Sequence, residues 1–161
     1  MNSTALRTAY DNLLDAAEHV AASDTHVALP PGQWDAEQQL AHLIAVDAGI
    51  LSVVGTIATG AHASFDNRLS LDTHNLARIS HRTGDRTQMI KRVRAQGHAL
   101  CEVVEPLSDD ELGQPIPTLL MSADVLLVDQ PLCLRDLLDG IATDHLPRHT
   151  QQLLALLPAS T

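Results

Sequence analysis

The sequence predicts an all-α protein: an antiparallel up-down four-helix bundle with a small irregular or hairpin insert between helices three and four. Apolar residues recur every three or four positions in four separate stretches, which is the periodicity of a helix with one buried face. Short connections between amphipathic helices favour antiparallel packing. The 161 residues suffice for one sizeable core, so we expect a single domain over residues 1–161.

The first two helices have clear boundaries in the sequence. Apolar positions on one face predict a helix over Thr4–Ala22, and the Pro-Pro-Gly sequence at 30–32 predicts a loop after it. Asp35 and Gln38 resemble a capping box, so the second helix should begin there and run to about Thr59. This helix is apolar on most sides, as expected for the most deeply packed helix of a bundle.

The remaining two helices follow a polar, mixed stretch over Gly60–Gly84, for which no element is predicted. The third helix should span about Asp85–Glu105, because Pro106 stops it. The last should span about Leu132–Leu157.

The insert at 108–131 carries two short apolar runs, Thr118–Met121 and Val125–Val128, separated by Ser122-Ala123-Asp124. This pattern predicts a small hairpin. So much apolar surface in a connection either covers the end of the bundle or meets a second subunit, and we expect a homodimer.

Composition excludes several classes of function. Twenty Asp+Glu against ten Lys+Arg give a net charge of −10, which repels a phosphate backbone, so no nucleic acid is expected. The most apolar stretch, Leu43–Thr59, is interrupted by Asp47 and is short for a membrane span of about 20 residues. With no targeting segment visible at the N-terminus, we expect a cytoplasmic protein without membrane contact.

Three histidines form the candidate site. His145 and His149 are four residues apart and so share one helix face, where two imidazoles can bind one transition metal. His42 lies among apolar residues of the second helix, where a histidine needs a partner. If the second and fourth helices are neighbours, His42 can complete a three-ligand site with an open coordination position. The alternative is a set of hydrogen-bonded core or surface histidines.

The segments that carry these histidines resemble a known superfamily. Trp34–Leu43 is similar to the W-x-x-x-x-x-L-x-H-L opening of helix two in the DinB-like (YfiT-like) proteins. Asp144–Leu153 looks like the helix-four signature of that superfamily, and Leu134–Ile141 before it is similar in register. One histidine on helix two and an HxxxH pair on helix four are the family order.

This resemblance implies a divalent metal, zinc or nickel most often, bound by His42, His145 and His149 in a catalytic site. It also implies a small-molecule substrate, and in many members a low-molecular-weight thiol such as mycothiol or bacillithiol. Thiol-dependent S-transferases and isomerases are the expected activities. Pro147 departs from a regular helix between the two ligands, because proline removes a helical hydrogen bond and usually kinks the chain.

Other polar residues could contribute to the same site or have a structural role instead. Arg82 and Arg86 belong to a cluster that holds half of the basic residues and could bind an anionic substrate or the thiol cofactor. Asp47 is expected to be a capped or solvent-facing carboxylate rather than a partner of an imidazole. Cys101 should be a buried thiol, and Cys133 should occupy the capping position of the last helix.

Three functions remain open at this point. The first is a metal-dependent enzyme in which the metal lowers the pKa of a thiol or water. The second is a metal-free isomerase or cyclase in small-molecule biosynthesis, with the histidines as acid and base. The third is a non-enzymatic binding protein.

Overall fold

The protein is mostly helical. The computed structural model describes residues 3–23, 27–30 and 32–158. Its long helices are α1 (Thr4–Ala22), α2 (Ala36–Ala58), α4 (Arg86–Val104) and a C-terminal helix of three consecutive parts: α6 (Leu134–Gly140), a π-helical turn (Ile141–His145) and α7 (Leu146–Leu154). Two shorter helices, α3 (Thr73–Thr83) and α5 (Asp109–Leu112), and a small sheet complete the fold.

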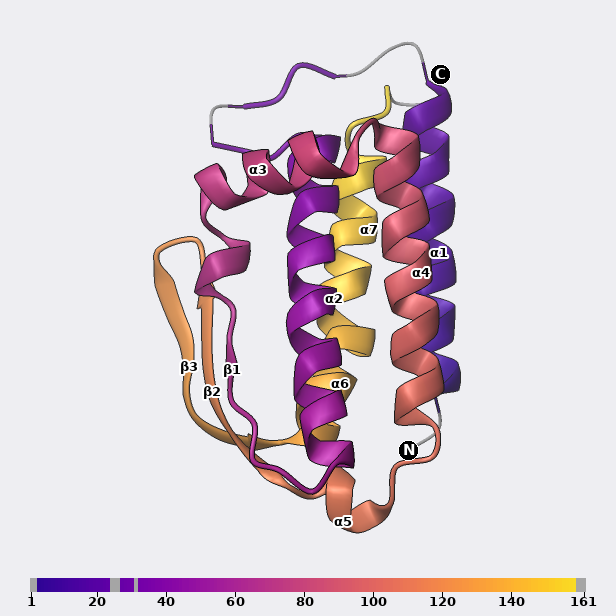
Figure 1. The fold of residues 1–161 in the computed structure, drawn as a ribbon. Coiled ribbons are helices and arrows are strands. Elements are labelled where there is room, and N and C mark those ends of the chain that lie inside the picture. Colours follow the sequence, from indigo (N-terminus) through magenta and orange to yellow (C-terminus); the bar gives the residue numbers. More distant parts are fainter. Residues whose placement is uncertain (1–2, 24–26, 31, 159–161) are drawn as a thin grey trace.

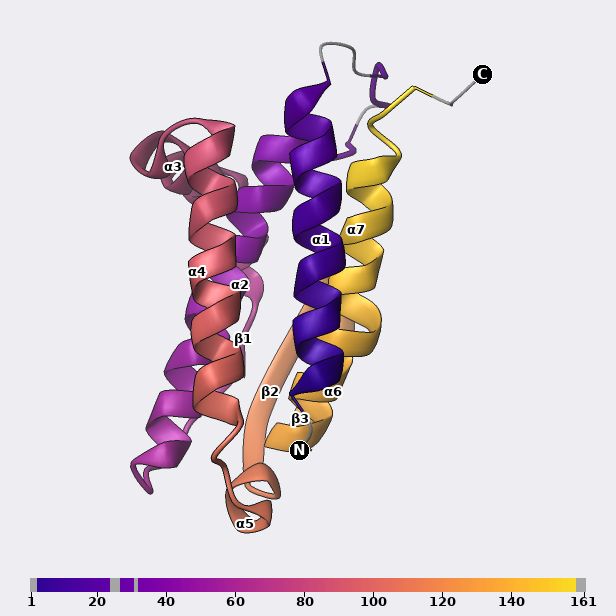
Figure 2. The same cartoon turned by 90° about the vertical axis from the view of Figure 1, so that its right-hand side faces the viewer.

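The four long helical segments lie side by side (Figure 1). α1 contacts α4 and α7, and α2 contacts the same two helices from the other side. The expected up-down order is wrong: Figures 1 and 2 show α2 and α4 running in the same direction, while α1 and α7 run in the opposite one. The physical reason is the segment between α2 and α4, which returns along the length of the molecule before α4 begins.

A three-stranded sheet corrects the all-α prediction. β2 (Pro115–Ser122) and β3 (Val125–Cys133) form the expected hairpin, and β1 (Phe65–Asp66) adds a parallel strand to β2. The strand order is β1-β2-β3. β1 comes from the stretch for which no element was predicted, and it also contacts α2. This explains how a hairpin that is marginal alone can form, because it is held by a third strand and a helix.

The helix boundaries in the sequence are otherwise close to the observed ones. The capping box at α2 is present: the Gln38 N–H donates to Asp35 Oδ1 at 2.8 Å, and the Asp35 N–H donates to Gln38 Oε1 at 3.1 Å. The last helix begins at Leu134 instead of Leu132, because β3 continues to Cys133. α3 was missed, since Leu76 is its one buried residue and leaves little apolar pattern to detect.

The core between the helices is aliphatic, with Tyr10 and Phe65 as its buried aromatic side chains. Among the described residues, α2 is the one helix long and apolar enough to cross a membrane, with a mean hydropathy of 1.9. Of the window that passes, 61 % is buried inside the protein, and core helices of soluble proteins meet the same criterion.

Candidate metal centre

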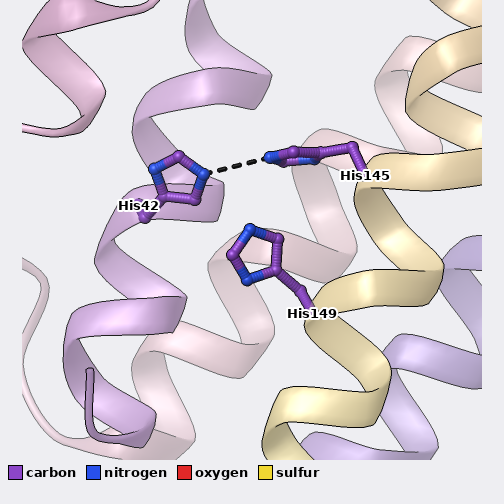
Figure 3. A group of neighbouring side chains, drawn as sticks. All are labelled: His42, His145 and His149. Carbon is purple, nitrogen blue, oxygen red and sulfur yellow. Dashed lines mark hydrogen bonds between the residues drawn. The ribbon is translucent and has the colours of Figure 1, made fainter. Parts of the chain in front are cut away.

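His42 of α2 and His145 and His149 of the C-terminal helix converge (Figure 3). One ring nitrogen of each lies within 4.8 Å of those of the other two, close enough to hold a metal ion. The Nε2 atoms of His42 and His145 are 3.0 Å apart. Two nitrogens bound to one zinc at 2.0–2.1 Å would be about 3.4 Å apart at a tetrahedral angle, so small side-chain shifts suffice. The predicted convergence of the three residues is confirmed.

The ring of His42 is oriented by its surroundings. Its Nδ1 lies 2.8 Å from the carbonyl oxygen of Ser70, which accepts only, so Nδ1 carries the proton. In the neutral ring this leaves the lone pair of Nε2 facing the other two histidines. The Trp34 ring packs against His42, with ring centroids 5.0 Å apart. A carbonyl on the second nitrogen is the usual way in which a ligating histidine is held in position.

The rings of His145 and His149 are not held by a carbonyl in this way. The Nδ1 atoms of His145 and His149 are buried without a hydrogen-bond partner. Because His42 Nε2 is an acceptor, His145 Nε2 must donate the proton in the 3.0 Å contact between the neutral rings. His42 and His145 are therefore a hydrogen-bonded pair in this tautomer, and metal binding at His145 Nε2 requires its proton to move to Nδ1 or to leave the ring.

The surroundings keep all three imidazoles neutral. Burial lowers the pKa of His42, against a smaller opposite effect of its hydrogen bond to Ser70. Burial also takes the pKa of His145 well below its ordinary value of 6.5, and repulsion from Arg148, and from His149 or His42 whenever either is protonated, lowers it further. For His149 burial is again the main cause, and the pKa falls to about 3. Neutral imidazoles are the form that binds a metal.

The π-helical turn at Ile141–His145 explains how Pro147 is accommodated. Proline at 147 has no N–H for the carbonyl of Thr143, and its ring would clash with that carbonyl in a regular helix. The wider turn ends at His145, two residues before Pro147, which lies in the first turn of α7. Such π-turns often mark functional sites. The departure from a regular helix therefore leaves His145 and His149 together instead of separating them.

The three histidines line one wall of a cavity of about 1070 Å³. The tip of the β2–β3 hairpin also lines this cavity. Apolar and aromatic lining residues include Leu29, Trp34, Val46, Phe65, Leu120, Met121, Leu127, Leu132 and Leu137. About half of its lining residues are polar, and a large cavity that combines apolar surface with convergent polar groups is a candidate small-molecule site.

The predicted anion-binding arginines do not line this cavity. Arg82 is exposed near the end of α3, and Arg86 is the first residue of α4. The guanidinium groups that do line it are those of Arg68 and Arg148. Each is already paired with a carboxylate, Arg68 with Asp66 at 2.6 Å and Arg148 with Asp144 at 2.6 Å.

Three further expectations were tested by the structure. Asp47 does not face solvent: it is 2 % exposed and accepts a 2.6 Å hydrogen bond from the hydroxyl of Tyr10. Cys101 is buried, as expected. Cys133 occupies the capping position, where its Sγ accepts from the Asp136 N–H at 3.4 Å. The partner of Asp47 was missed because an aromatic hydroxyl 37 residues away leaves no local signal.

Two residues of the site were also missed. Ser70 contributes its backbone oxygen, a group that every residue carries, so no sequence pattern points to it. Asn67 lines the cavity beside the hairpin, in the stretch for which no element was predicted. In the sequence Asn67 is a single polar residue between Asp66 and Arg68, which is too common a pattern to single out.

Compared with protein-family models, with curated proteins and with solved structures, the chain gives no match. The resemblance to the DinB-like superfamily therefore stays a prediction.

Proposed function

We propose that this protein is a metal-dependent enzyme of the DinB-like, four-helix-bundle type that acts on a small molecule. The single observation that carries the proposal is the convergence of three neutral imidazoles on the wall of a large cavity. His42, His145 and His149 would hold a divalent metal, zinc or nickel. Three protein ligands leave a coordination position open, which is the pattern of catalytic sites and not of structural ones.

The chain's own residues set the conditions for this chemistry. Ser70 holds the His42 ring, and burial keeps the imidazoles free of protons. A bound divalent metal would supply Lewis acidity that lowers the pKa of a thiol or water and so yields a nucleophile at neutral pH. With a thiol cosubstrate the reaction is an S-transfer or an isomerisation.

A specific observation favours a second candidate, the metal-free isomerase or cyclase. The 3.0 Å contact between His42 and His145 already forms a donor–acceptor pair of the kind used in acid–base catalysis. In this alternative the lone pair of His42 Nε2 would accept a proton from the substrate, and the imidazolium so formed would return that proton to another substrate atom.

Metal titration of untagged, chelator-treated protein distinguishes the two. Cobalt(II) in a three-histidine site gives visible absorption bands, and zinc should displace it with one equivalent per chain. His149→Ala should abolish the bands, while His62→Ala, which changes an exposed histidine, should not. The metal-dependent proposal fails if cobalt gives no bands with the wild type or the same bands with His149→Ala.

The open position is tested separately with small thiols. Addition of 2-mercaptoethanol to the cobalt-loaded protein should produce a sulfur-to-cobalt charge-transfer band near the ultraviolet. A cobalt spectrum that no thiol changes would favour a role without a thiol. The homodimer and the cytoplasmic location also remain proposals, and light scattering at micromolar concentration tests the first.

A further inference from the structure

The side chain of Asn67 extends the sheet beyond the end of β1. β1 is two residues long, and the backbone N–H of Asn67 still donates to the Leu119 carbonyl of β2 at 3.2 Å. The side-chain amide then forms the next pair of bonds: Nδ2 donates to the Met121 carbonyl at 2.8 Å, and Oδ1 accepts from the Met121 N–H at 2.8 Å. One side chain thus takes the place of a third strand residue.

This amide clamp lies where the hairpin is irregular. Leu120 pairs with Val128 and Met121 pairs with Leu126, so Leu127 is the extra residue of a bulge. Both Met121 and Leu127 line the cavity. A bulge weakens the ladder locally and redirects side chains. Asn67 compensates by binding both backbone groups of Met121, and it thereby holds hairpin residues that line the same cavity as the histidines.

The backbone of Asn67 also leads toward the metal centre. Its carbonyl accepts from the Ser70 N–H at 3.0 Å and from the Ser70 hydroxyl at 2.7 Å, which closes the turn over 67–70. Ser70 is buried, and its own carbonyl accepts from His42 Nδ1 at 2.8 Å. An unbroken set of hydrogen bonds therefore runs from Met121 in the hairpin through Asn67 and Ser70 to His42.

We propose that Asn67 is a positioning residue of the histidine centre, which anchors the turn over 67–70 to β2 and thereby places the Ser70 carbonyl that orients His42. The inference rests on the proposed metal function. Asn67 touches neither the histidines nor a metal, so it acts through Ser70. Partners that hold ligating histidines in place typically change metal affinity by 10–100-fold when removed.

The test compares variants of Asn67 in cobalt and zinc affinity. Asn67→Ala removes both bonds to Met121 and should weaken cobalt binding at least about tenfold. Asn67→Asp has nearly the same shape and keeps the acceptor for the Met121 N–H, but it places an oxygen against the Met121 carbonyl. Asn67→Asp should weaken cobalt binding by a similar factor, although this substitution, unlike Asn67→Ala, creates no cavity.

Asn75 provides a matched control. Its Nδ2 donates to the Leu69 carbonyl at 2.7 Å, so it holds the same turn from α3, and its Oδ1 accepts from Arg78 rather than from β2. Asn75→Ala should change cobalt affinity less than about threefold. Ser108→Ala, which removes the cap of α5, controls for a loss of stability alone, since such caps are worth about 1 kcal/mol. Asn67 variants with wild-type affinity, or an equal loss in Asn75→Ala, would overturn the proposal.

The reciprocal effect can be measured in the wild type and does not depend on whether a variant folds. If Asn67 positions His42 for the metal, metal binding must stabilise the clamp by the same coupling free energy. Zinc should therefore slow hydrogen exchange of the Met121 amide by about tenfold. The Gly113 amide, which bonds to Asp109 near α5, should change little.

These outcomes separate the two proposals. A wild type that binds no cobalt contradicts the proposed function. A wild type that binds cobalt, with exchange at Met121 unchanged by zinc, contradicts only the role of Asn67.

Discussion

Two buried polar side chains of α2, His42 and Asp47, have opposite surroundings. They are five residues apart, which places them about 7.5 Å apart along the helix axis and about 140° apart around it. His42 is 3 % exposed and lines the cavity with two other histidines. Asp47 is 2 % exposed, faces Tyr10 of α1, and does not line that cavity. One helix thus carries a site that a ligand can reach and a polar contact sealed within the core.

The comparison shows one physical cause acting in two directions. Burial disfavours the charged form of any group, so it lowers the pKa of His42 and raises the pKa of Asp47 to about 7. The Tyr10 hydroxyl stabilises the ionised carboxylate and opposes part of the second shift. The histidines become metal-binding bases, whereas Asp47 becomes a hydrogen-bond partner that costs stability when ionised. Three predictions test this difference between the surroundings of His42 and Asp47.

The largest expected effect concerns zinc and acid. At pH 7.5, free zinc at a thousand times its Kd should raise the free energy of unfolding by about 4 kcal/mol. Because folding lowers the pKa of all three imidazoles, protons compete with zinc at a lower pH than they would for exposed histidines, and a measurable part of this increment should persist at pH 5.5. Chemical denaturation with and without zinc at both pH values measures it.

The metal-free protein should behave differently in the same experiment. Below pH 6.5 the unfolded chain takes up protons that the folded histidines do not, so stability falls on acidification, by about 1.4 kcal/mol per pH unit for each such group. His149→Ala should show no zinc increment at either pH. An increment that vanishes between pH 6.5 and pH 5.5 would mean that the imidazoles titrate as if exposed.

The second largest effect concerns the contact between Tyr10 and Asp47. A methyl group at Gly97 of α4 would come within 2.6 Å of the Tyr10 ring. Gly97→Ala must therefore displace that ring and weaken its hydrogen bond to Asp47. We expect a loss of about 3 kcal/mol, from overpacking and from a buried acceptor without its partner. The midpoint of denaturant unfolding gives the value.

Gly55 of α2 is the matched control for this substitution. It is exposed, and a methyl group there would contact nothing within 4 Å. Gly55→Ala should stabilise the protein by up to about 1 kcal/mol, the helix preference of alanine over glycine. Equal effects of the two substitutions would contradict the close packing of α4 on Tyr10.

The smallest effect is that of Asp47→Asn. Asparagine keeps an acceptor for the Tyr10 hydroxyl and cannot ionise. The folded pKa of Asp47 lies above its unfolded value of 3.8, so the folded state binds more protons between those values and the wild type loses stability as pH rises through that range. The stability of Asp47→Asn relative to wild type should therefore grow by about 1–3 kcal/mol from pH 5 to pH 8.

Asp15→Asn, which changes an exposed carboxylate on α1, controls for net charge. Zinc affinity should stay within about twofold of wild type in Asp47→Asn, because the side chain lies on another face of α2. A tenfold change in zinc affinity would show that Asp47 and the histidine centre are energetically coupled, against the separation seen in the structure.

Much of the candidate site could be predicted because its signals are local. The i,i+4 spacing of His145 and His149 places both rings on one face of any helix that contains them. The apolar residues around His42 indicate burial without reference to a partner. The capping box at Asp35 likewise marks the start of α2 through contacts between residues three positions apart.

The long helices and the three candidate ligands could therefore be predicted from the sequence, because helical periodicity and capping depend on neighbours within one or two turns. The topology and the partners of the buried polar groups could be seen only in the tertiary structure. The parallel course of α2 and α4, the pairing of β1 with β2, and the partners Ser70 and Tyr10 all depend on contacts between distant segments. Such contacts form through backbone groups that every residue carries, or through packing that no short pattern encodes.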